Sequence, residues 1–372
     1  MGNTFIQQLE QQVASLQAAP ASSTQLVDAL NELAHAYYSL DIHKGLDTAG
    51  AACQLARHLL YPQGEADSLI NLSWLLIQDG KLDSAYVQAE HALFIANQLG
   101  DKHRQVQSTH MLAVIHYEAG NYQKAESFWL DLLAKAREAG DRRRQADYLT
   151  ALGILHQEQS NLALAYDHKR LAHEIYVELD DPNQVISLNN LAYLLTRMGQ
   201  HDKALMLASE ALRRCSIESQ SWRSMILHTL GLIHLYQQSY EEARRLFDSS
   251  ITLSLHLNKQ QAIRSLIDLA KLEWECHNRP DACNALTQAL EIADEIKSIK
   301  LQGQAHQCLY RYYLQMKAYA AASRHHEQSL ACDHALGCKR MEKQVQIMRA
   351  NATVLNAKSG WSHDSRLWLR AA

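Results

Sequence analysis

Residues that interrupt helices are scarce in this sequence. Only 4 of its 372 residues are proline and 14 are glycine, and the glycines do not cluster. So few breaks argue against an α/β enzyme of this length and against long linkers. The sequence also lacks a phosphate loop, a Gly-x-Ser-x-Gly elbow and a dinucleotide-binding fingerprint. We therefore expect a protein that is not an enzyme and needs no cofactor.

Signals that direct a chain to a membrane are missing as well. The first residues lack the basic leader and apolar core of a secretory signal, and no apolar run approaches a membrane span. The seven cysteines are an odd number and include no Cys-x-x-Cys pair. We therefore expect reduced thiols and a cytoplasmic protein. The net charge of −4 at pH 7 argues against nucleic acid as a partner.

The 20 histidines raise the question of a metal site. The densest cluster of potential ligands lies near the C-terminus, where one histidine and one cysteine are spaced i, i+4 and could share a zinc ion. A complete site needs two more ligands, and four other cysteines fall at small apolar helix positions, where a buried thiol packs as a hydrophobe: Cys53, Cys215, Cys283 and Cys308. We expect no metal, although a metal- or redox-sensing protein stays an alternative. The cluster comprises His325, His326, Cys332, His334 and Cys338.

The dominant feature is a helical hairpin that recurs eight times. Residues 188–212 contain two apolar patterns of helical spacing, and Gly199 between them can adopt the left-handed backbone that ends a helix. One hairpin cannot bury both its faces, so repetition at a fixed period predicts a solenoid. Leucines equivalent to Leu191 recur every 39 or 40 residues, at Leu33, Leu72, Leu112, Leu152, Leu191, Leu230, Leu269 and Leu309. Thirteen residues later stand Ala85, Ala125, Ala165, Ala204, Ala243, Ala282 and Ala322.

These residues resemble the tetratricopeptide repeat (TPR). The leucine, the second-helix alanines and the turn glycines Gly80, Gly120 and Gly199 match the family pattern, over about residues 23 to 335. The aromatic of the second helix is kept at Trp129 and Phe247, but Lys169 and His326 replace it elsewhere. The period exceeds the usual TPR length of about 34, as in a longer TPR variant. A HEAT or armadillo array, with a period of about 40–47, is the runner-up.

The resemblance implies an all-α fold: a right-handed superhelical solenoid of about eight TPR-like hairpins with capping helices at both ends. We predict an N-terminal capping helix within residues 1–22, one elongated array over 23–337, an exit helix over 338–358 and a flexible tail over 359–372. In the exit helix, apolar residues recur at spacings of 3 and 4, which is a short heptad seam. This seam is made by Cys338, Met341, Val345, Met348, Ala352 and Leu355. It makes a homo-oligomer through this helix possible, and a solvated end helix is the alternative.

The predicted function is binding of a protein or peptide in the concave groove. In a TPR stack the first helices line that groove, and exposed aromatics there are common anchors. Asn71, Asn189 and Asn190 resemble asparagines by which some TPRs hold a ligand's backbone. The alternative for Trp74 and Trp274 is packing between adjacent first helices. The candidate site comprises Tyr38, Asn71, Trp74, His110, Tyr117, Asn189, Asn190, Tyr193, His228, Lys271, Trp274 and Arg311.

Charge along the predicted groove changes sign. Asp67 and Asp147 stand over the earlier repeats, and Lys271 and Arg311 over the later ones. The long repeats and Gly-Asp joints are similar to TPR sensor modules of bacterial signalling proteins, which implies an adaptor or a sensor whose output lies elsewhere. A structural scaffold without a groove ligand is a further alternative.

Overall fold

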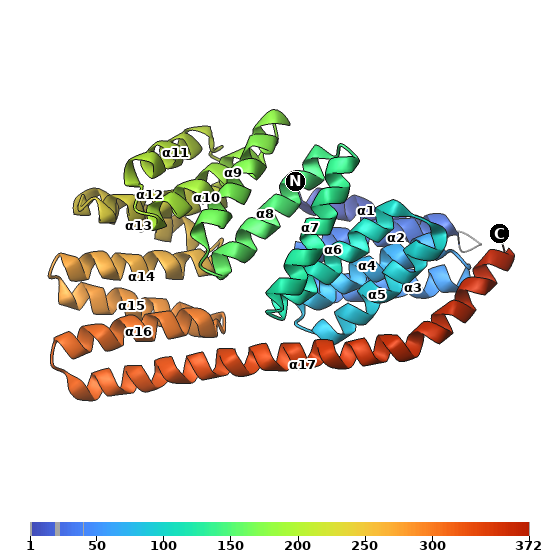
Figure 1. The fold of residues 1–372 in the computed structure, drawn as a ribbon. Coiled ribbons are helices and arrows are strands. Elements are labelled where there is room, and N and C mark those ends of the chain that lie inside the picture. Colours follow the sequence, from blue (N-terminus) through green and yellow to red (C-terminus); the bar gives the residue numbers. More distant parts are fainter. Residues whose placement is uncertain (1, 19–22, 40, 372) are drawn as a thin grey trace. The chain divides into compact units, whose positions relative to one another are not determined.

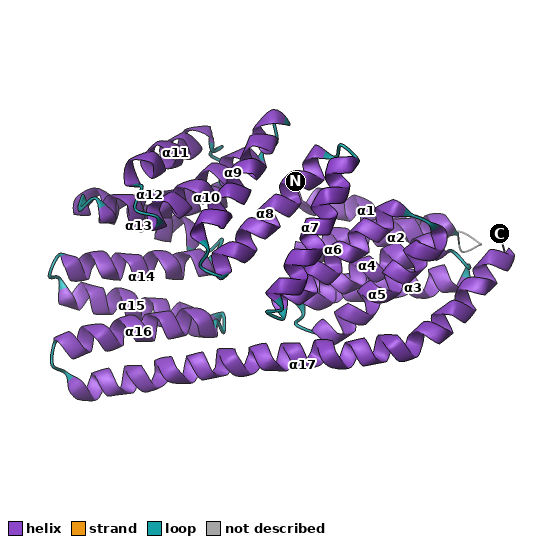
Figure 2. Ribbon diagram, in the orientation of Figure 1, coloured by secondary structure: helices purple, strands orange, loops and turns teal. Residues whose placement is uncertain are grey.

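The structure is a computed structural model that describes the backbone of residues 2–18, 23–39 and 41–371. Within these residues every regular element is a helix, and the helices follow one another as antiparallel hairpins (Figure 1 and Figure 2). The predicted all-α array of about eight TPR-like hairpins is confirmed, with α1 preceding the first hairpin and α16 and α17 forming the last. The helices are α1 (Gly2–Gln17), α2 (Thr24–Ala36), α3 (Ile42–His58), α4 (Pro62–Gln78), α5 (Leu82–Leu99), α6 (Lys102–Glu118), α7 (Tyr122–Glu138), α8 (Arg142–Glu158), α9 (Leu162–Glu178), α10 (Asn183–Arg197), α11 (His201–Arg214), α12 (Gln220–Tyr236), α13 (Tyr240–Ser254), α14 (Lys259–Glu275), α15 (Arg279–Glu295), α16 (Ile299–Gln315) and α17 (Tyr319–Ala371), with a short 3₁₀ turn η1 (Tyr37–Ser39) after α2.

The recurring small residues lie where the two helices of a hairpin touch. The second-helix alanines at the repeat position of Ala204 are almost fully buried in every hairpin that has one. On the first helix, a Cβ atom added to Gly231 would stand 2.7 Å from Cε1 of Phe247 on the second helix. The leucine-and-alanine spacing therefore marks the line of closest approach between the two backbones, as close packing requires.

The turns and joints have the predicted backbone. Gly199 adopts a left-handed conformation with φ of 76°, and Gln238 takes the same position of the next repeat with φ of 60°. Between repeats, Gly100 is left-handed, and the side chain of Asp101 accepts a hydrogen bond from the backbone N–H of Arg104. Glycine thus closes one helix and aspartate caps the next.

The array, which the sequence predicts as one elongated domain, divides into two compact units. Unit 1 comprises residues 1–135 and 340–372, and unit 2 comprises residues 136–339. Each repeat of a solenoid contacts chiefly its neighbours, so an array can divide inside a hairpin without any break in the sequence pattern. The boundary falls within α7, where the leucine and alanine positions continue unchanged.

The end of the chain differs from the predicted boundaries. The second helix of the last hairpin and the exit helix predicted for 338–358 form one continuous helix, α17, and its backbone is helical through the 359–371 segment that was predicted to be a tail. Gly337 stands at the predicted boundary between the two helices, but its backbone is helical. Among the residues described, no left-handed residue interrupts α17. The side chains of residues 359 and 362–372, Trp368 included, lie outside the described residues.

Residues 340–361 of α17 pack onto the second-helix side of unit 1. Ile347, Ala350 and Val354 are buried in the core cluster that contains α4, α5 and α6 residues. The Trp361 ring stacks on the His91 ring of α5, with centroids 4.4 Å apart. The hydroxyl of Tyr86 donates a hydrogen bond of 2.5 Å to Oδ1 of Asn351. The last part of the chain is therefore an integral layer of the N-terminal unit.

Candidate functional site

In unit 1, the predicted residues near the N-terminus bind one another. Tyr38 in η1 donates a hydrogen bond to the Asn71 side chain, and the Tyr38 and Trp74 rings lie 5.8 Å apart. The Asn71 amide in turn donates to the backbone oxygen of Asn31, at 3.0 Å, so it links two adjacent first helices. Asn71 is therefore a buried residue with partners inside the protein, and its contact with a ligand's backbone stays a prediction.

The other predicted residues of unit 1 meet the second helix of their own hairpin. Nε1 of Trp129 donates to Nδ1 of His110 at 3.3 Å, and the Tyr117 and Trp129 rings lie 5.8 Å apart. Burial lowers the pKa of His110 to about 4, because a charged imidazole would lose its hydration there. The acidic residue expected to favour a basic ligand, Asp67, is bound by the Arg104 guanidinium at 2.6 and 2.9 Å.

In unit 2, His228 and Lys271 both bind the carboxylate of Asp268, a residue that the sequence prediction did not include. Nε2 of His228 lies 2.9 Å from Oδ2 of Asp268, and Nζ of Lys271 lies 2.6 Å from Oδ1 of the same side chain. The His228 hydrogen bond and the Lys271 charge hold the pKa of Asp268 below its ordinary value despite its burial. A signal was available, because Asp268 lies 40 residues after His228, one repeat period on, and three residues before Lys271.

The aromatic candidates of unit 2 serve packing. Trp274 stacks on Tyr312 of the next first helix, with ring centroids 4.0 Å apart, and Tyr193 packs against the cluster around Phe247. The alternative of packing between adjacent first helices therefore applies to Trp274. Arg311 on α16 is exposed.

The two adjacent asparagines of α10 have different environments. Asn189 is 3% exposed, and its Oδ1 has no hydrogen-bond partner in the structure. Asn190 is half-buried and lines a pocket between α8, α9 and α10, with a volume of about 170 Å³. The pocket brings together hydroxyl, amide and ammonium groups from three helices. Its lining comprises Thr150, Lys169, Tyr176, Asn183, Ile186, Ser187 and Asn190.

Lys169 is the cation of this pocket, and the sequence prediction did not include it. It replaces the second-helix aromatic of other repeats, and Gly153 makes room for it, since an added Cβ there would stand 2.6 Å from the Lys169 Cγ. The side chain is 7% exposed, and its Nζ donates to Oε1 of Gln157 at 2.6 Å. Burial lowers the pKa of Lys169 to about 8, and the negative charge of Glu158 partly opposes this shift. Among the residues that the structure describes, no carboxylate forms an ion pair with this ammonium group.

The hydroxyl groups of the pocket are anchored to its wall. The Tyr176 hydroxyl lies 3.2 Å from the Thr150 hydroxyl and donates to Oδ1 of Asp147, also at 3.2 Å. On the α10 side, Oγ of Ser187 lies 2.7 Å from Nδ1 of His173. Polar groups at fixed positions around a buried cation can recognise an anionic group without rearrangement.

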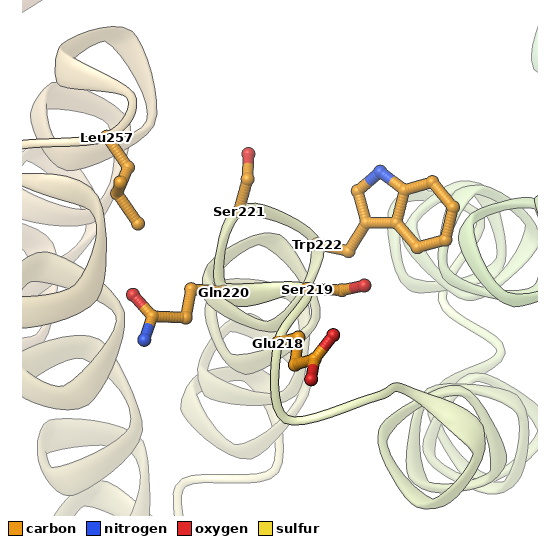
Figure 3. Close-up of a pocket in the computed structure, with 6 residues that line it drawn as sticks. All are labelled: Glu218, Ser219, Gln220, Ser221, Trp222 and Leu257. Carbon is orange, nitrogen blue, oxygen red and sulfur yellow. The ribbon is translucent and has the colours of Figure 1, made fainter. Parts of the chain in front are cut away.

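A second hollow lies at the joint before α12. It has a volume of about 300 Å³ and is lined by Glu218, Ser219, Gln220, Ser221, Trp222 and Leu257. Gln220 and Leu257 face one side of the beginning of α12, whereas Trp222 lies on the other side (Figure 3). Since these side chains do not converge on one point, the hollow contributes no recognisable site.

The residues described here include no group of three or more histidine, cysteine or acidic side chains placed to hold a metal ion. In the histidine and cysteine cluster near the C-terminus, for which the sequence predicts no metal, the Cys338 thiol lies 3.7 Å from Nδ1 of His334. All seven cysteines are free thiols. Within the described part of the chain, no helix is both long and apolar enough to cross a membrane.

Comparison with known proteins identifies the repeat. Residues 106–139 and two overlapping stretches, 144–217 and 183–256, match sequence models of the tetratricopeptide repeat. No curated protein sequence matches the chain. Three solved structures have a similar fold. Each of them matches most of this chain over almost its own full length.

The apo form of the quorum sensor NprR from B. thuringiensis is 12% identical, with a TM-score of 0.56, over 88% of this chain and 98% of that one. The apo form of RapI is 11% identical, with a TM-score of 0.52, over 84% and 98%. A Rap protein complexed with competence and sporulation factor is 15% identical, with a TM-score of 0.50, over 85% and 99%. The chain is therefore a tetratricopeptide-repeat protein, similar in fold to the bacterial quorum sensor NprR and to Rap proteins.

Proposed function

We propose that the protein is a cytoplasmic adaptor or sensor that binds an acidic segment of a peptide or protein on the first-helix face of unit 2. The repeat fold supports a binding role, and one protein of similar fold was solved as a complex with competence and sporulation factor. The seven free thiols are compatible with a reducing compartment. The proposal involves no catalysis, nucleic acid or membrane.

The observation that carries this proposal is the buried Lys169 ammonium. A buried ammonium group that forms no ion pair is costly, because water no longer solvates it and the charge of the nearby Glu158 offsets only part of that loss. A carboxylate entering the pocket would supply that charge and form charge-assisted hydrogen bonds. Asn190 and Ser187 line the same pocket and offer further polar groups to a ligand. The ligand group best matched by these side chains is the carboxylate of an acidic side chain or of a peptide C-terminus.

The charges elsewhere support the same preference. Asp67, expected to attract a basic ligand, is already paired with Arg104, and Asp268 neutralises Lys271. Arg311 remains an exposed cation of unit 2. The proposed site is therefore centred on the pocket in unit 2 and not spread over the full set of aromatics, most of which pack against neighbouring side chains.

The test is selection of ligands from a displayed library of random linear peptides, carried out on the full chain. We expect the selected peptides to be rich in Asp and Glu. The Lys169→Met variant, which keeps the apolar stem and removes the charge, should bind them about tenfold more weakly or worse, since a hydrogen bond to a charged group contributes about 1.5–3 kcal/mol.

The matched control is Lys203→Met, which removes an exposed lysine of the same unit. It should leave the affinity unchanged. Selected peptides without acidic residues, or equal binding by the parent and Lys169→Met, would contradict the role of the pocket. Recovery of no binding peptide at all would contradict the groove function as a whole.

A further inference from the structure

Helix α17 has two apolar faces, and only one of them is covered. The covered face of residues 340–361 carries Ile347, Ala350, Val354 and Trp361, all less than 9% exposed. The opposite face carries Met341, Val345, Met348 and Leu355, which are 61%, 43%, 71% and 73% exposed. A helix that is apolar on both faces is normally buried on both. The exposed seam is the heptad pattern seen in the sequence, and it faces away from unit 1.

Polar contacts fix which face points outward. Nη2 of Arg340 donates to the Gly120 backbone oxygen at 3.1 Å, and Lys343 pairs with Glu118 at 3.3 Å. Farther along, Lys358 lies 3.4 Å from Glu90. These contacts and the buried apolar residues recur at spacings of three and four on the same side of α17. The helix therefore cannot rotate its exposed seam into unit 1 without breaking them.

We propose that the exposed seam of α17 pairs with the same seam of a second copy of the chain, in antiparallel orientation. A two-fold symmetric interface uses the same surface on both subunits, so the seam must be complementary to itself. In the antiparallel register centred between Val345 and Met348, Val345 lies opposite the partner's Met348. Met341 then lies opposite the small Ala352 of the partner subunit, and Cys338 opposite the partner's Leu355. Large side chains thus face small or branched ones in successive layers, as in knobs-into-holes packing.

Charge complementarity favours this orientation. Glu342 and Arg349 both flank the seam on the same side, both are exposed, and neither forms an ion pair with another residue described in the structure. In the antiparallel register each Glu342 lies beside Arg349 of the partner subunit, and the two-fold axis creates this pair twice. In a parallel pair in register, Glu342 would lie beside the partner's Gly337 and Arg349 beside the partner's Gln344. Opposite charges at flanking positions select orientation in helix pairs.

A coiled coil that is stable on its own usually needs about three heptads or more, and the seam is shorter than that. Here the helix is already formed and held on unit 1, so pairing does not have to order it first. This proposal does not depend on the peptide site, because the seam is a different surface, and from Met341 onward it belongs to unit 1.

The first test is analytical ultracentrifugation of the full chain under reducing conditions over a range of concentrations. We expect a dimer whose dissociation constant rises about tenfold or more in Met348→Glu, since the substitution places a charge in both central layers of the seam. Thr353→Glu, which adds the same charge at an exposed position off the seam, should dimerise like the parent. Circular dichroism verifies that both variants stay folded. A parent chain that is monomeric throughout, or a dimer unaffected by Met348→Glu, overturns the proposal.

Orientation is tested by charge reversal and by cross-linking. Glu342→Arg and Arg349→Glu should each weaken the dimer, because like charges then face each other, and the double variant should restore it. In addition, Leu355→Cys oxidised with oxidised glutathione should give an intermolecular disulfide to native Cys338, identified by mass spectrometry of the dimer. Adding Cys338→Ser should abolish that cross-link. Failure of the double variant to restore the dimer, or a cross-link joining two Cys338 residues, overturns the antiparallel register.

Discussion

Gly231 shows how a single residue sets the distance between two helices. A Cβ atom at this position would stand 2.7 and 2.8 Å from two atoms of the Phe247 ring, which is itself fully buried. The ring cannot move away without displacing its own packing partners. Gly231 is therefore a packing residue, because the absence of a side chain lets the Phe247 ring pack directly against its backbone.

We predict that Gly231→Leu destabilises the protein by about 1–3 kcal/mol, as overpacking does. The measurement is urea denaturation followed by circular dichroism. Gly337→Leu is the matched control, because an added Cβ there meets nothing within 4 Å, and helix propensity favours leucine over glycine. An unchanged midpoint for Gly231→Leu would mean that the two helices do not approach at this residue.

The turn of the sixth repeat carries a strained residue. Gln238 has φ of 60° at the position where Gly199 has φ of 76° one repeat earlier. A left-handed backbone costs a residue with a side chain about 1–2 kcal/mol, whereas glycine adopts it freely.

We predict that Gln238→Gly stabilises the protein by up to about 1 kcal/mol, and that Gly199→Gln destabilises it by a similar amount. Thermal unfolding of the two variants beside the parent measures both effects. Shifts of the same sign in the two variants would contradict the assignment of strain to this turn position.

At the scale of the element, α17 is unusual because it belongs to the last hairpin at one end and to unit 1 at the other. Val354 is 3% exposed in the unit 1 core, whereas the preceding Thr353 is exposed. If surface ion pairs alone held the helix on unit 1, a charged residue would be tolerated at both positions. If apolar packing holds it, a charged residue is tolerated at Thr353 but not at Val354.

We predict that Val354→Asp weakens docking of residues 340–361 by about 2 kcal/mol or more, because an unpaired carboxylate would enter an apolar core. Hydrogen exchange of the α5 and α17 amides measures it, and exchange should accelerate in both helices. Thr353→Asp should exchange like the parent. If the two aspartate variants behave alike, residues 340–361 do not contribute to the unit 1 core.

At the scale of the molecule, the buried histidines make unit 1 sensitive to acid. Burial lowers the pKa of His110 and of His116 to about 4, from an ordinary value of 6.5. Between these values the unfolded chain takes up protons that the folded unit does not, so acid favours unfolding. Protonation of Nδ1 in His110 would also remove the acceptor of the Trp129 hydrogen bond.

We therefore predict that the stability of unit 1 is complete above pH of about 6.5 and falls as the pH decreases toward 4, by at most about 3 kcal/mol for each histidine. Urea denaturation followed by fluorescence of the unit 1 tryptophans, across this pH range, measures the loss. His110→Gln can still accept from Trp129 and should flatten the profile. A parent profile that is level between pH 4 and 6.5 would rule out this effect.

What the sequence alone determined is local. The leucine spacing, the alanines and Gly199 specify hairpins because the residues that pack together lie within one repeat, such as Gly231 and Phe247, 16 positions apart. Periodicity and turn chemistry report on such short-range contacts directly. The same patterns place the candidate residues on first helices. They do not show which of these side chains already contact neighbouring residues of the protein.

Tertiary structure decided the rest, because it depends on contacts that no local pattern encodes. Asn71 and Trp274 are engaged across repeats, and Asp268 joins His228 to Lys271. The Lys169 pocket needs side chains from three helices. The contact of Tyr86 with Asn351 spans 265 residues. The heptad seam of the C-terminal helix was legible in the sequence, yet only the docking of its opposite face on unit 1 determined that the seam points outward.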